Sequence, residues 1–475
     1  MADQPTRVIG CGVMRDAHLD PDATAIAAAV RTGRTTARSV VEEALERIAL
    51  HRTNAVVTVG AAAARATAAR IDEAVARGDD PGPLAGVPIT IKDTLATAGL
   101  RATAGSLVLA DHIPNHDAEV VARLRAAGAV LVGKTNCPEF ALQPRTDNRI
   151  FGPTAHPFDP SRSPGGSSGG CAAAVAGGLV PFSIGGDYGG SVRYPAACTG
   201  IYGLRPTYRA VPTAGHVPEP AEGTPRRRFQ TVGPLARTPR DIRLLFDVIA
   251  AVGARPSART TAGDAPSPRI GVVRGGWSCI TAVADSVDRA ARSFADVGYD
   301  VVDVDPAPFV EAADVYAAWR ASDEYTDLRA LVAGREADLT THIARLLATR
   351  PVPADVTARF EAVGRAVAAV LASTPVLVLP VARVGVLGLE ATEIEIDGRV
   401  ESVDALQVLA PSRAVTVLGL PSLAVPAGLD RDGLPIGVQV VGAANTEHQL
   451  VAVAETLRSA PALGDAPVRA GERDL

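Results

Sequence analysis

Two short apolar runs on either side of one helical segment restrict the fold of this chain more than any other feature. The runs GVPITIKD at 86–93 and VLVGKT at 130–135 are rich in the β-branched residues that favour strands. The segment HDAEVVARLRAAGA at 116–129 lies between them and carries apolar residues at helical spacing. Strand, helix and strand in this order indicate a parallel α/β sheet.

The rest of the chain continues this alternation. Two helices are expected within residues 22–50, the second after a cap at Thr35 or Thr36, and a third runs through the alanine-rich 60s to Ala76. Later expected elements are a helix at 241–252, strands at 269–275 and near Val301, helices within 307–373, and apolar strands at 375–380, 421–428 and 434–442.

The composition is that of an ordinary globular protein. Of 475 residues, 47% are hydrophobic and 21% charged, which suffices for a large core without disulfides or metal staples. The formal net charge of −5 provides no broad basic surface for nucleic acid or anionic lipid. We therefore expect neither nucleic acid nor a membrane among the partners.

The cysteines and the N-terminus favour a cytoplasmic location. The five cysteines are odd in number and form no C-x-x-C pair, which suits reduced thiols better than disulfides or zinc. The N-terminus lacks the basic start and apolar run of a secretory signal. The longest apolar stretch, 171–184, is broken by glycine and proline and is too short to span a bilayer. The cysteines are Cys11, Cys137, Cys171, Cys198 and Cys279.

Only two lysines occur among the 47 basic residues, Lys92 and Lys134. A protein arginine cannot give up its proton, whereas a lysine can. Lysines that persist in an arginine-rich chain therefore mark positions where arginine cannot serve.

Two clusters of glycine and serine, FDPSRSPGGSSGG at 158–170 and IGGDYGGSVRYPAACTG at 184–200, form the most unusual segment. A short small-residue helix is expected between them. A phosphate-binding loop would need G-x-x-x-x-G-K-[ST], but Cys171 follows the first cluster. Neither cluster has the G-x-S-x-G form of a Ser-His-Asp hydrolase.

The eight histidines are scattered through the sequence, and we expect each to have a surface or structural role. They are His18, His51, His112, His116, His156, His216, His342 and His448.

A serine nucleophile with a lysine base is the third possibility. Lys92 ends the strand GVPITIKD, where burial would disfavour its charged form. The structural alternative is a salt bridge between Lys92 and the adjacent Asp93.

Several motifs together resemble the amidase signature family of serine hydrolases. The likeness runs from about residue 20 to 240 and returns near the C-terminus. The motifs are GPLAGVPITIKD, TAGS at 103–106, RLRAAGAVLVGKTN, GPTAHPFDPSRSPGGSSGG, GGDYGGSVRYPAACTGIYGLRPT and PSLAVPAGLDRDGLPIGVQVVG.

The resemblance implies a Ser-Ser-Lys triad and no cofactor or metal. It places the nucleophile at Ser191, the bridging serine at Ser167 and the base at Lys92, and the 24 residues between the two serines match the family spacing. It also implies a cis peptide bond between Gly166 and Ser167.

Further roles follow from the same resemblance. Backbone N–H groups would form the oxyanion hole at Tyr188, Gly189, Gly190 and Ser191. Supporting roles fall to Ser168, Asp187 and Arg193.

Departures from the family pattern leave the substrate open. Gly186 stands where threonine is usual, and Tyr188 where a small residue or isoleucine is common. Cys198 and Thr199 replace Phe-Cys, and Cys137 replaces a frequent methionine.

The implied fold is a single large α/β domain whose mixed, mostly parallel central sheet is covered by helices on both faces. Residues 1–65 would form a helical segment packed on the core, residues 66–465 the amidase signature domain, and residues 466–475 a flexible tail. Within the domain, the signature core spans about 85–210 and a variable substrate-pocket region about 255–375.

The expected function is hydrolysis of a linear carboxamide to a carboxylate and ammonia or an amine, through a Ser191 acyl-enzyme. The expected partner is a small-molecule amide, with no nucleic acid or membrane, and the expected state is a monomer or homodimer. One alternative is the glutamine-hydrolysing A subunit of a tRNA-dependent amidotransferase, which has Gln where this chain has Tyr194. A membrane lipid-amide hydrolase would need an anchor or apolar cap, and a non-catalytic binding protein would not need an intact triad.

Overall fold

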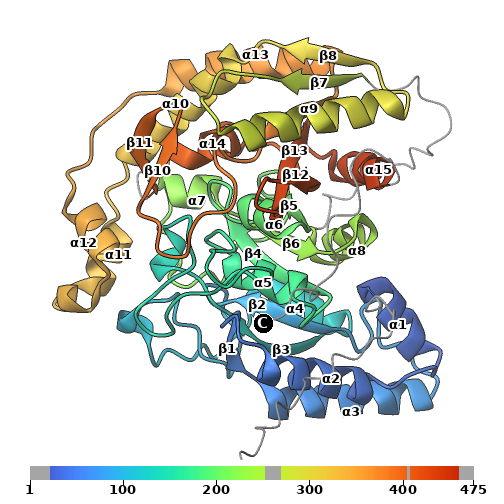
Figure 1. Ribbon diagram of the computed structural model, residues 1–475. Helices are drawn as coiled ribbons and strands as arrows, with labels where there is room; N and C mark the ends of the chain where they lie inside the picture. The colour runs from blue at the N-terminus through green and yellow to red at the C-terminus, as the bar shows by residue number, and fades with distance from the viewer. Residues whose placement is uncertain (1–21, 252–268, 404–406, 459–475) are drawn as a thin grey trace, which may run out of the picture.

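The computed structural model describes residues 22–251, 269–403 and 407–458, and it confirms the predicted α/β class. Within these residues, eleven strands form one mixed sheet that runs from β1, near the N-terminal helices, to β8 in the C-terminal half (Figure 1). In sheet order the strands are β1 (Val56–Val59), β3 (Val130–Thr135), β2 (Pro88–Lys92), β4 (Phe182–Asp187), β6 (Thr231–Ala236), β5 (Tyr202–Arg205), β12 (Ser422–Leu429), β13 (Pro435–Gly442), β9 (Val376–Pro380), β7 (Ile270–Val273) and β8 (Val301–Val304). A separate hairpin contains β10 (Glu393–Ile396) and β11 (Arg399–Ser402).

Parallel strands occur in two groups of three within the sheet. Strand β2 is parallel to β3 and β4, and β7 is parallel to β8 and β9. Antiparallel pairs from β4 to β9 join the two groups. Strands β2 and β4 therefore end at the same edge, where a parallel sheet commonly carries its functional loops.

Helices of the N-terminal half lie mainly around β1 to β6 (Figure 1). Thr36 accepts a hydrogen bond from Ser39 N–H at 3.0 Å, which confirms the predicted cap. The helices are α1 (Ala23–Arg31), α2 (Ala37–Leu50), α3 (Ala61–Ala76), α4 (Glu119–Ala126), α5 (Gly169–Ala176), α6 (Arg193–Thr199), α7 (Pro225–Phe229) and α8 (Pro239–Ile249).

Helices of the C-terminal half complete the cover of the sheet. Helix α9 packs on β9 and β13, while α10 packs against α13 and α14. Figure 1 shows α11 and α12 together at one side of the molecule. The helices are α9 (Thr281–Asp296), α10 (Ala307–Ala321), α11 (Thr326–Val332), α12 (Thr341–Ala348), α13 (Thr357–Ser373), α14 (Ala410–Val417) and α15 (Glu447–Arg458).

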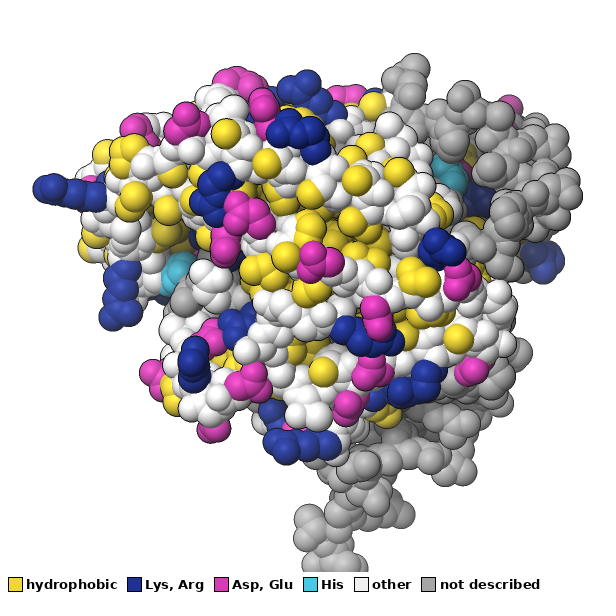
Figure 2. Space-filling model, turned by 90° about the horizontal axis from the view of Figure 1, so that it is seen from above, with side chains coloured by type: hydrophobic (Ala, Val, Ile, Leu, Met, Phe, Trp, Pro, Cys, Tyr) yellow, Lys and Arg dark blue, Asp and Glu magenta, His cyan; other side chains and the backbone are white. Residues whose placement is uncertain are grey.

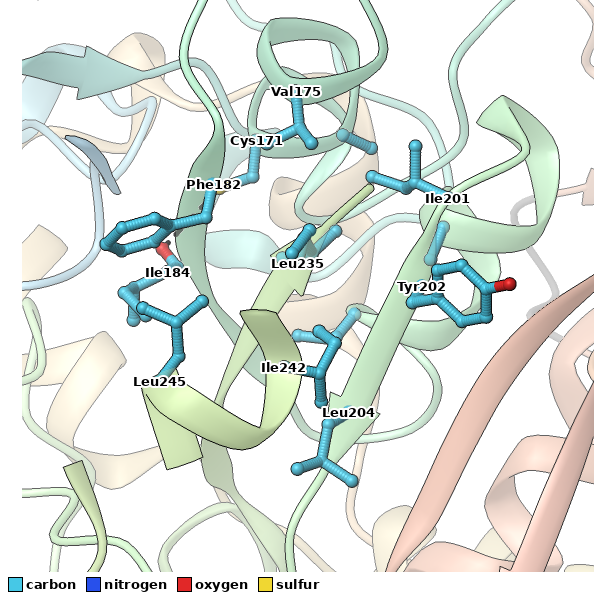
Figure 3. Packing of buried hydrophobic residues seen from close by; sticks show 14 of the residues in the cluster. Cys171, Val175, Phe182, Ile184, Ile201, Tyr202, Leu204, Leu235, Ile242 and Leu245 are labelled. Carbon is cyan, nitrogen blue, oxygen red and sulfur yellow. Dashed lines mark hydrogen bonds between the residues drawn. The ribbon is translucent and has the colours of Figure 1, made fainter. Parts of the chain in front are cut away.

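The core is aliphatic and covers β4 from both faces. Figure 3 shows Phe182 and Ile184 of β4 on the side of Leu245 from α8. Side chains alternate along a strand, so the intervening Ser183 and Gly185 face α5. Helix α5 consists of small residues that are nearly all buried, and it can therefore lie close to the sheet.

Several elements near the site escaped prediction from the sequence. The Pro-, Gly- and Arg-rich segment from about Pro206 to Arg240 carries no clear helix or strand pattern, yet it contains α7 and β6. Strand β6 includes Gly233 and Pro234, which disfavour strands by themselves. Pairing with β4 and β5 on its two sides overrides that local preference.

The predicted domain boundaries can be compared with the positions of these helices and strands. The boundary after residue 65 falls inside α3, and β1 pairs with β3 in the main sheet. We therefore propose one domain that includes the N-terminal segment. The predicted tail, residues 466–475, lies outside the described residues.

The surface seen in Figure 2 carries arginine, acidic and apolar side chains interspersed with one another. Among the helices that the structure describes, none has the length and apolar character needed to cross a bilayer.

Candidate active site

The predicted triad residues come from three segments that meet at one edge of the sheet. Lys92 is the last residue of β2, Ser167 lies just before α5, and Ser191 lies between β4 and α6. All three line one cavity of about 40 Å³. The two serine loops also contact each other directly, because Ser168 N–H donates to the Ser191 carbonyl at 3.1 Å.

The Lys92 amine is buried against hydroxyl groups. Its Nζ lies 2.6 Å from Ser167 Oγ and 3.0 Å from Ser168 Oγ, and the residue is only 1% exposed. Burial lowers the pKa of Lys92 below its ordinary value because the charged amine loses its hydration. The peptide bond between Gly166 and Ser167 is cis, as the resemblance implied.

The alternative partner of Lys92, Asp93, points elsewhere. Asp93 Oδ2 accepts a hydrogen bond from Thr103 N–H at 2.9 Å and another from the Thr103 hydroxyl. Within the described residues no ion pair joins Asp93 to Lys92, because successive side chains of a strand point to opposite faces. The second lysine, Lys134, donates to the Leu95 carbonyl, and burial lowers its pKa to about 8.

Asp187 holds the Ser191 loop in shape. Its carboxylate accepts hydrogen bonds from the N–H groups of Gly190 at 2.9 Å and Val192 at 3.1 Å. Two buried arginines, Arg193 and Arg205, pair with the same carboxylate at 2.9 and 3.4 Å. Burial alone would raise the pKa of Asp187, but these positive charges and hydrogen bonds outweigh it and hold the pKa well below its usual range.

Four backbone N–H groups were expected to face an oxyanion. That of Gly190 already donates to Asp187, so the expectation needs correction there. Among the described residues, the N–H groups of Tyr188, Gly189 and Ser191 donate to no protein acceptor. Tyr316 Oη donates to the Tyr188 carbonyl at 2.9 Å and so fixes the orientation of this loop.

The cavity wall includes residues that sequence reasoning missed. His216 lines the cavity, although a surface or structural role was expected for every histidine. Its Nδ1 lies 2.8 Å from the Thr213 carbonyl, and we therefore assign the proton to Nδ1. Burial lowers the pKa of His216 to about 4, so its ring is neutral near pH 7. Its Nε2 is buried and has no partner among the described residues.

Other wall residues come from a family motif and from segments that carry no motif. Gly186 belongs to the wall, and a Cβ atom at this position would lie 3.4 Å from His216 Nε2. The glycine therefore leaves space where the family pattern has threonine. The remaining side chains are contributed mainly by the loops at 140–142 and 217–230, and they include Phe140, Leu142, Arg226 and Gln230.

The α/β fold and the amine–hydroxyl cluster are features of a hydrolase that cleaves C–N bonds. The family model named Amidase matches residues 39–451, and the chain belongs to this family, the amidase signature enzymes. The predicted family, the fold and the interpretation as an amidase are thereby confirmed.

Curated relatives and solved structures extend this result. The chain is 34% identical to the A subunit of glutamyl-tRNA(Gln) amidotransferase from Synechococcus sp. (strain RCC307), over 90% of this chain and 94% of that protein. The corresponding protein of Koribacter versatilis is also 34% identical, over 92% and 98%. A bacterial aryl acylamidase of the amidase signature family superposes with a TM-score of 0.83 at 27% identity, covering 95% of this chain and 99% of that one. Native peptide amidase from Stenotrophomonas maltophilia has a TM-score of 0.73 at 27% identity, with 94% and 99% covered.

These relatives correct one prediction. We expected a small-molecule amide as the partner and no nucleic acid, and this is contradicted by curated relatives that are subunits of an amidotransferase named for glutamyl-tRNA(Gln). Net charge was a poor guide, because it averages over the whole surface and does not describe local binding sites. The relatives also fit the alternative function, the glutamine-hydrolysing subunit, better than a free amidase.

The variant Asp187→Asn tests the role of the buried carboxylate. We expect the free energy of unfolding to fall by about 3–5 kcal/mol, because two buried guanidinium groups lose their counter-charge. The measurement is denaturant unfolding at pH 7. The matched control is Asp300→Asn, whose exposed ion pair with Arg269 should contribute at most about 1 kcal/mol.

The difference in unfolding free energy between wild type and Asp187→Asn should depend on pH. A lowered pKa in the folded state stabilises the protein above the unfolded-state value of about 3.9, and this stabilisation is lost as the pH falls toward the folded pKa. The difference between wild type and Asp187→Asn should therefore shrink below about pH 4. A difference that stays constant down to about pH 2 would contradict the assignment.

Proposed function

We propose that this chain is the glutamine-hydrolysing subunit of a tRNA-dependent amidotransferase. The similarity to such a subunit over 90% of the chain supports the assembly and the substrate. One observation is the main support for the hydrolysis itself. Lys92 Nζ lies 2.6 Å from Ser167 Oγ, in a cavity that Ser191 also lines.

In the proposed reaction, neutral Lys92 accepts a proton that passes from Ser191 through Ser167. The Ser191 oxygen attacks the amide carbonyl, and the resulting tetrahedral intermediate carries a negative charge on the former carbonyl oxygen. The proton then returns by the same route to the leaving nitrogen, and ammonia departs. Water hydrolyses the Ser191 ester and regenerates the enzyme. Burial of Lys92 supports this scheme because it disfavours the charged amine, which cannot act as a base.

We assign the oxyanion hole to the backbone N–H groups of Tyr188, Gly189 and Ser191. These groups have no acceptor among the described residues, whereas Gly190 N–H donates to Asp187. Donors that are already oriented toward the developing charge stabilise it without reorganisation, and the loss of one typically costs about 2.7–4 kcal/mol. Asp187, Arg193 and Ser168 are assigned supporting roles, because they fix the two serine loops.

A second candidate function is hydrolysis of a linear amide by the isolated protein. The aromatic and aliphatic side chains of Phe140, Leu142 and Tyr188 in the cavity wall favour an apolar substrate group. The structural similarity to an aryl acylamidase and to a peptide amidase supports the same possibility.

We also keep a cytoplasmic location as a proposal. The four cysteines within the described residues, Cys137, Cys171, Cys198 and Cys279, are free thiols. Free thiols suit a reducing compartment.

The variant Ser191→Ala should lower kcat for amide hydrolysis by more than about 10³-fold, because the nucleophile is removed. Ammonia release measures the rate, and the melting temperature checks the fold. The matched control is Ser183→Ala, which removes a buried serine hydroxyl of β4 that bonds Thr90 outside the cavity and should keep its activity. Activity near the wild-type level in Ser191→Ala would place the nucleophile elsewhere.

The variant Lys92→Arg should lose about 10²–10⁴-fold in kcat/KM, because a guanidinium keeps the charge but cannot accept a proton. In the wild type, kcat/KM should rise with pH and level off above the lowered pKa of Lys92, since only the neutral amine is active. A pH–rate profile of glutamine hydrolysis measures this rise of kcat/KM with pH. Full activity of the arginine variant would show that the lysine is structural.

The two candidate functions predict different substrate preferences. For the amidotransferase component, ammonia release from glutamine should exceed that from a neutral anilide or peptide amide, and it should be lost in Ser191→Ala. A strong preference for the anilide with no release from glutamine would contradict the first proposal and favour the second.

A further inference from the structure

Within the described residues, two arginines beside the candidate active site, one buried and one half-buried, form no ion pair with an acidic side chain. Arg413 belongs to α14 and is only 5% exposed, with its guanidinium carbon 5.3 Å from the centre of the Tyr316 ring. Arg320 lies near the end of α10 and is half-buried. Burial of a positive charge is unfavourable unless the charge is paired.

The missing partner distinguishes these two arginines from the others near the site. Within the described residues, no hydrogen bond or ion pair reaches Arg413, and its Nε is fully buried and unsatisfied. The hydrogen bond recorded for Arg320 joins its Nε to the Tyr325 hydroxyl at 3.4 Å. By contrast, Arg193 pairs with Asp187 at 2.9 Å.

The acidic residue in the wall of the larger cavity beside these arginines is paired with another arginine. Asp323 lines the same cavity as Arg320 and Arg413, but its Oδ2 lies 3.4 Å from Arg226 Nε. Its Oδ1 accepts from the Tyr325 N–H group at 2.9 Å. Asp323 therefore forms its ion pair with Arg226 and a hydrogen bond within its own loop.

The position of the pair relates it to the nucleophile. Arg320 and Arg413 line a narrow pocket of about 20 Å³ together with Gly189 and Ser191. The same two arginines also line an adjoining cavity of about 250 Å³. A group bound between them would therefore lie next to the residue proposed to attack the amide.

The electrostatics of the pair favour an anion. Burial lowers the pKa of Arg413 to about 10, because the charged guanidinium loses hydration. A guanidinium remains charged at this value at neutral pH. Its planar set of donors matches the two oxygens of a carboxylate, and charge-assisted hydrogen bonds of this kind are stronger than neutral ones.

We propose that Arg320 and Arg413 bind a carboxylate carried by the acyl part of the amide substrate. This inference rests on the proposed hydrolysis at Ser191, and it specifies the substrate class as an amide with an anionic group at a fixed distance from the scissile carbonyl. Glutamine belongs to this class, and a neutral aryl amide does not. The arginine pair thus decides between the two candidate functions.

The test compares glutaramate with pentanamide, which has the same carbon chain but a methyl group in place of the carboxylate. The wild type should prefer glutaramate. In Arg413→Met and in Arg320→Met, the ratio of kcat/KM for glutaramate to that for pentanamide should fall about 10- to 100-fold, the range for hydrogen bonds between charged groups. The ratio separates lost anion binding from a general loss of packing, which would lower both rates.

The matched control is Arg359→Met, which removes one positive charge from α13 at an exposed ion pair with Glu311. The ratio should stay at the wild-type value in this variant. Melting temperatures verify that each variant folds, and Arg320→Met provides the test if Arg413→Met does not.

Binding of glutarate, measured by calorimetry, needs no turnover. Wild type and Arg359→Met should bind it, and the affinity of Arg320→Met and Arg413→Met should fall about 10- to 100-fold. Amide hydrolysis without glutarate binding or glutaramate preference would overturn the anion site and leave the proposed hydrolysis intact. Glutarate binding that depends on the arginines, with no hydrolysis of any amide, would support the site and overturn the hydrolysis.

Discussion

The geometry of the site depends on the hydrogen bonds and ion pairs of the buried Asp187 carboxylate. Asp187 ends β4, binds the N–H groups of the Ser191 loop and pairs with Arg193 and Arg205. Arg193 continues the network, because its Nη1 donates to the Ser412 carbonyl at 3.0 Å and to Gln439 Oε1 at 2.8 Å. One buried charge thus connects the Ser191 loop to α14 and to β13, in the distant half of the sheet. A loop held in this way can present backbone donors in a constant orientation, which is the condition for electrostatic stabilisation of an oxyanion.

Buried charged groups with an oppositely charged partner lie close to buried groups without one in this protein. We assign structural roles to the paired groups and roles in catalysis or binding to the unpaired ones. Around Asp187 every charge has a partner, and the carboxyl group keeps its ionised form. Among the described residues Lys92 has only hydroxyl partners, so burial shifts it toward the neutral amine. Arg413 cannot respond in the same way, because a guanidinium keeps its proton even when buried. A buried lysine without a counter-charge can therefore become a base, whereas a buried arginine without one needs an anion.

Local patterns in the sequence predicted the fold class. The resemblance to the amidase signature family placed Lys92, Ser167 and Ser191 in one site, and all three line one cavity. A run of β-branched residues, a glycine-rich loop and a small-residue helix each act within a few positions. The arginine pair and His216 could not be predicted, since their segments carry no motif and reach the site only through packing of α10, α14 and the loop after β5. The Gly190 N–H group was assigned wrongly for a related reason, because the competing acceptor is a side chain whose direction depends on the folded loop.

The two ends of the cavity give the substrate a direction. Leu142, Tyr188 and Ser191 line both the cavity of Lys92 and the narrow pocket of the arginines, so Ser191 lies between them. A carboxylate held at Arg320 and Arg413 leaves the amide nitrogen on the side of Lys92 and Ser167. In the proposed reaction, the leaving nitrogen receives its proton on that side, from Lys92 through Ser167. His216 lines the same side, its Nε2 has no partner in the described part of the chain, and Gly186 leaves room beside it. Anion binding at one end and proton return at the other therefore require the same orientation of the amide.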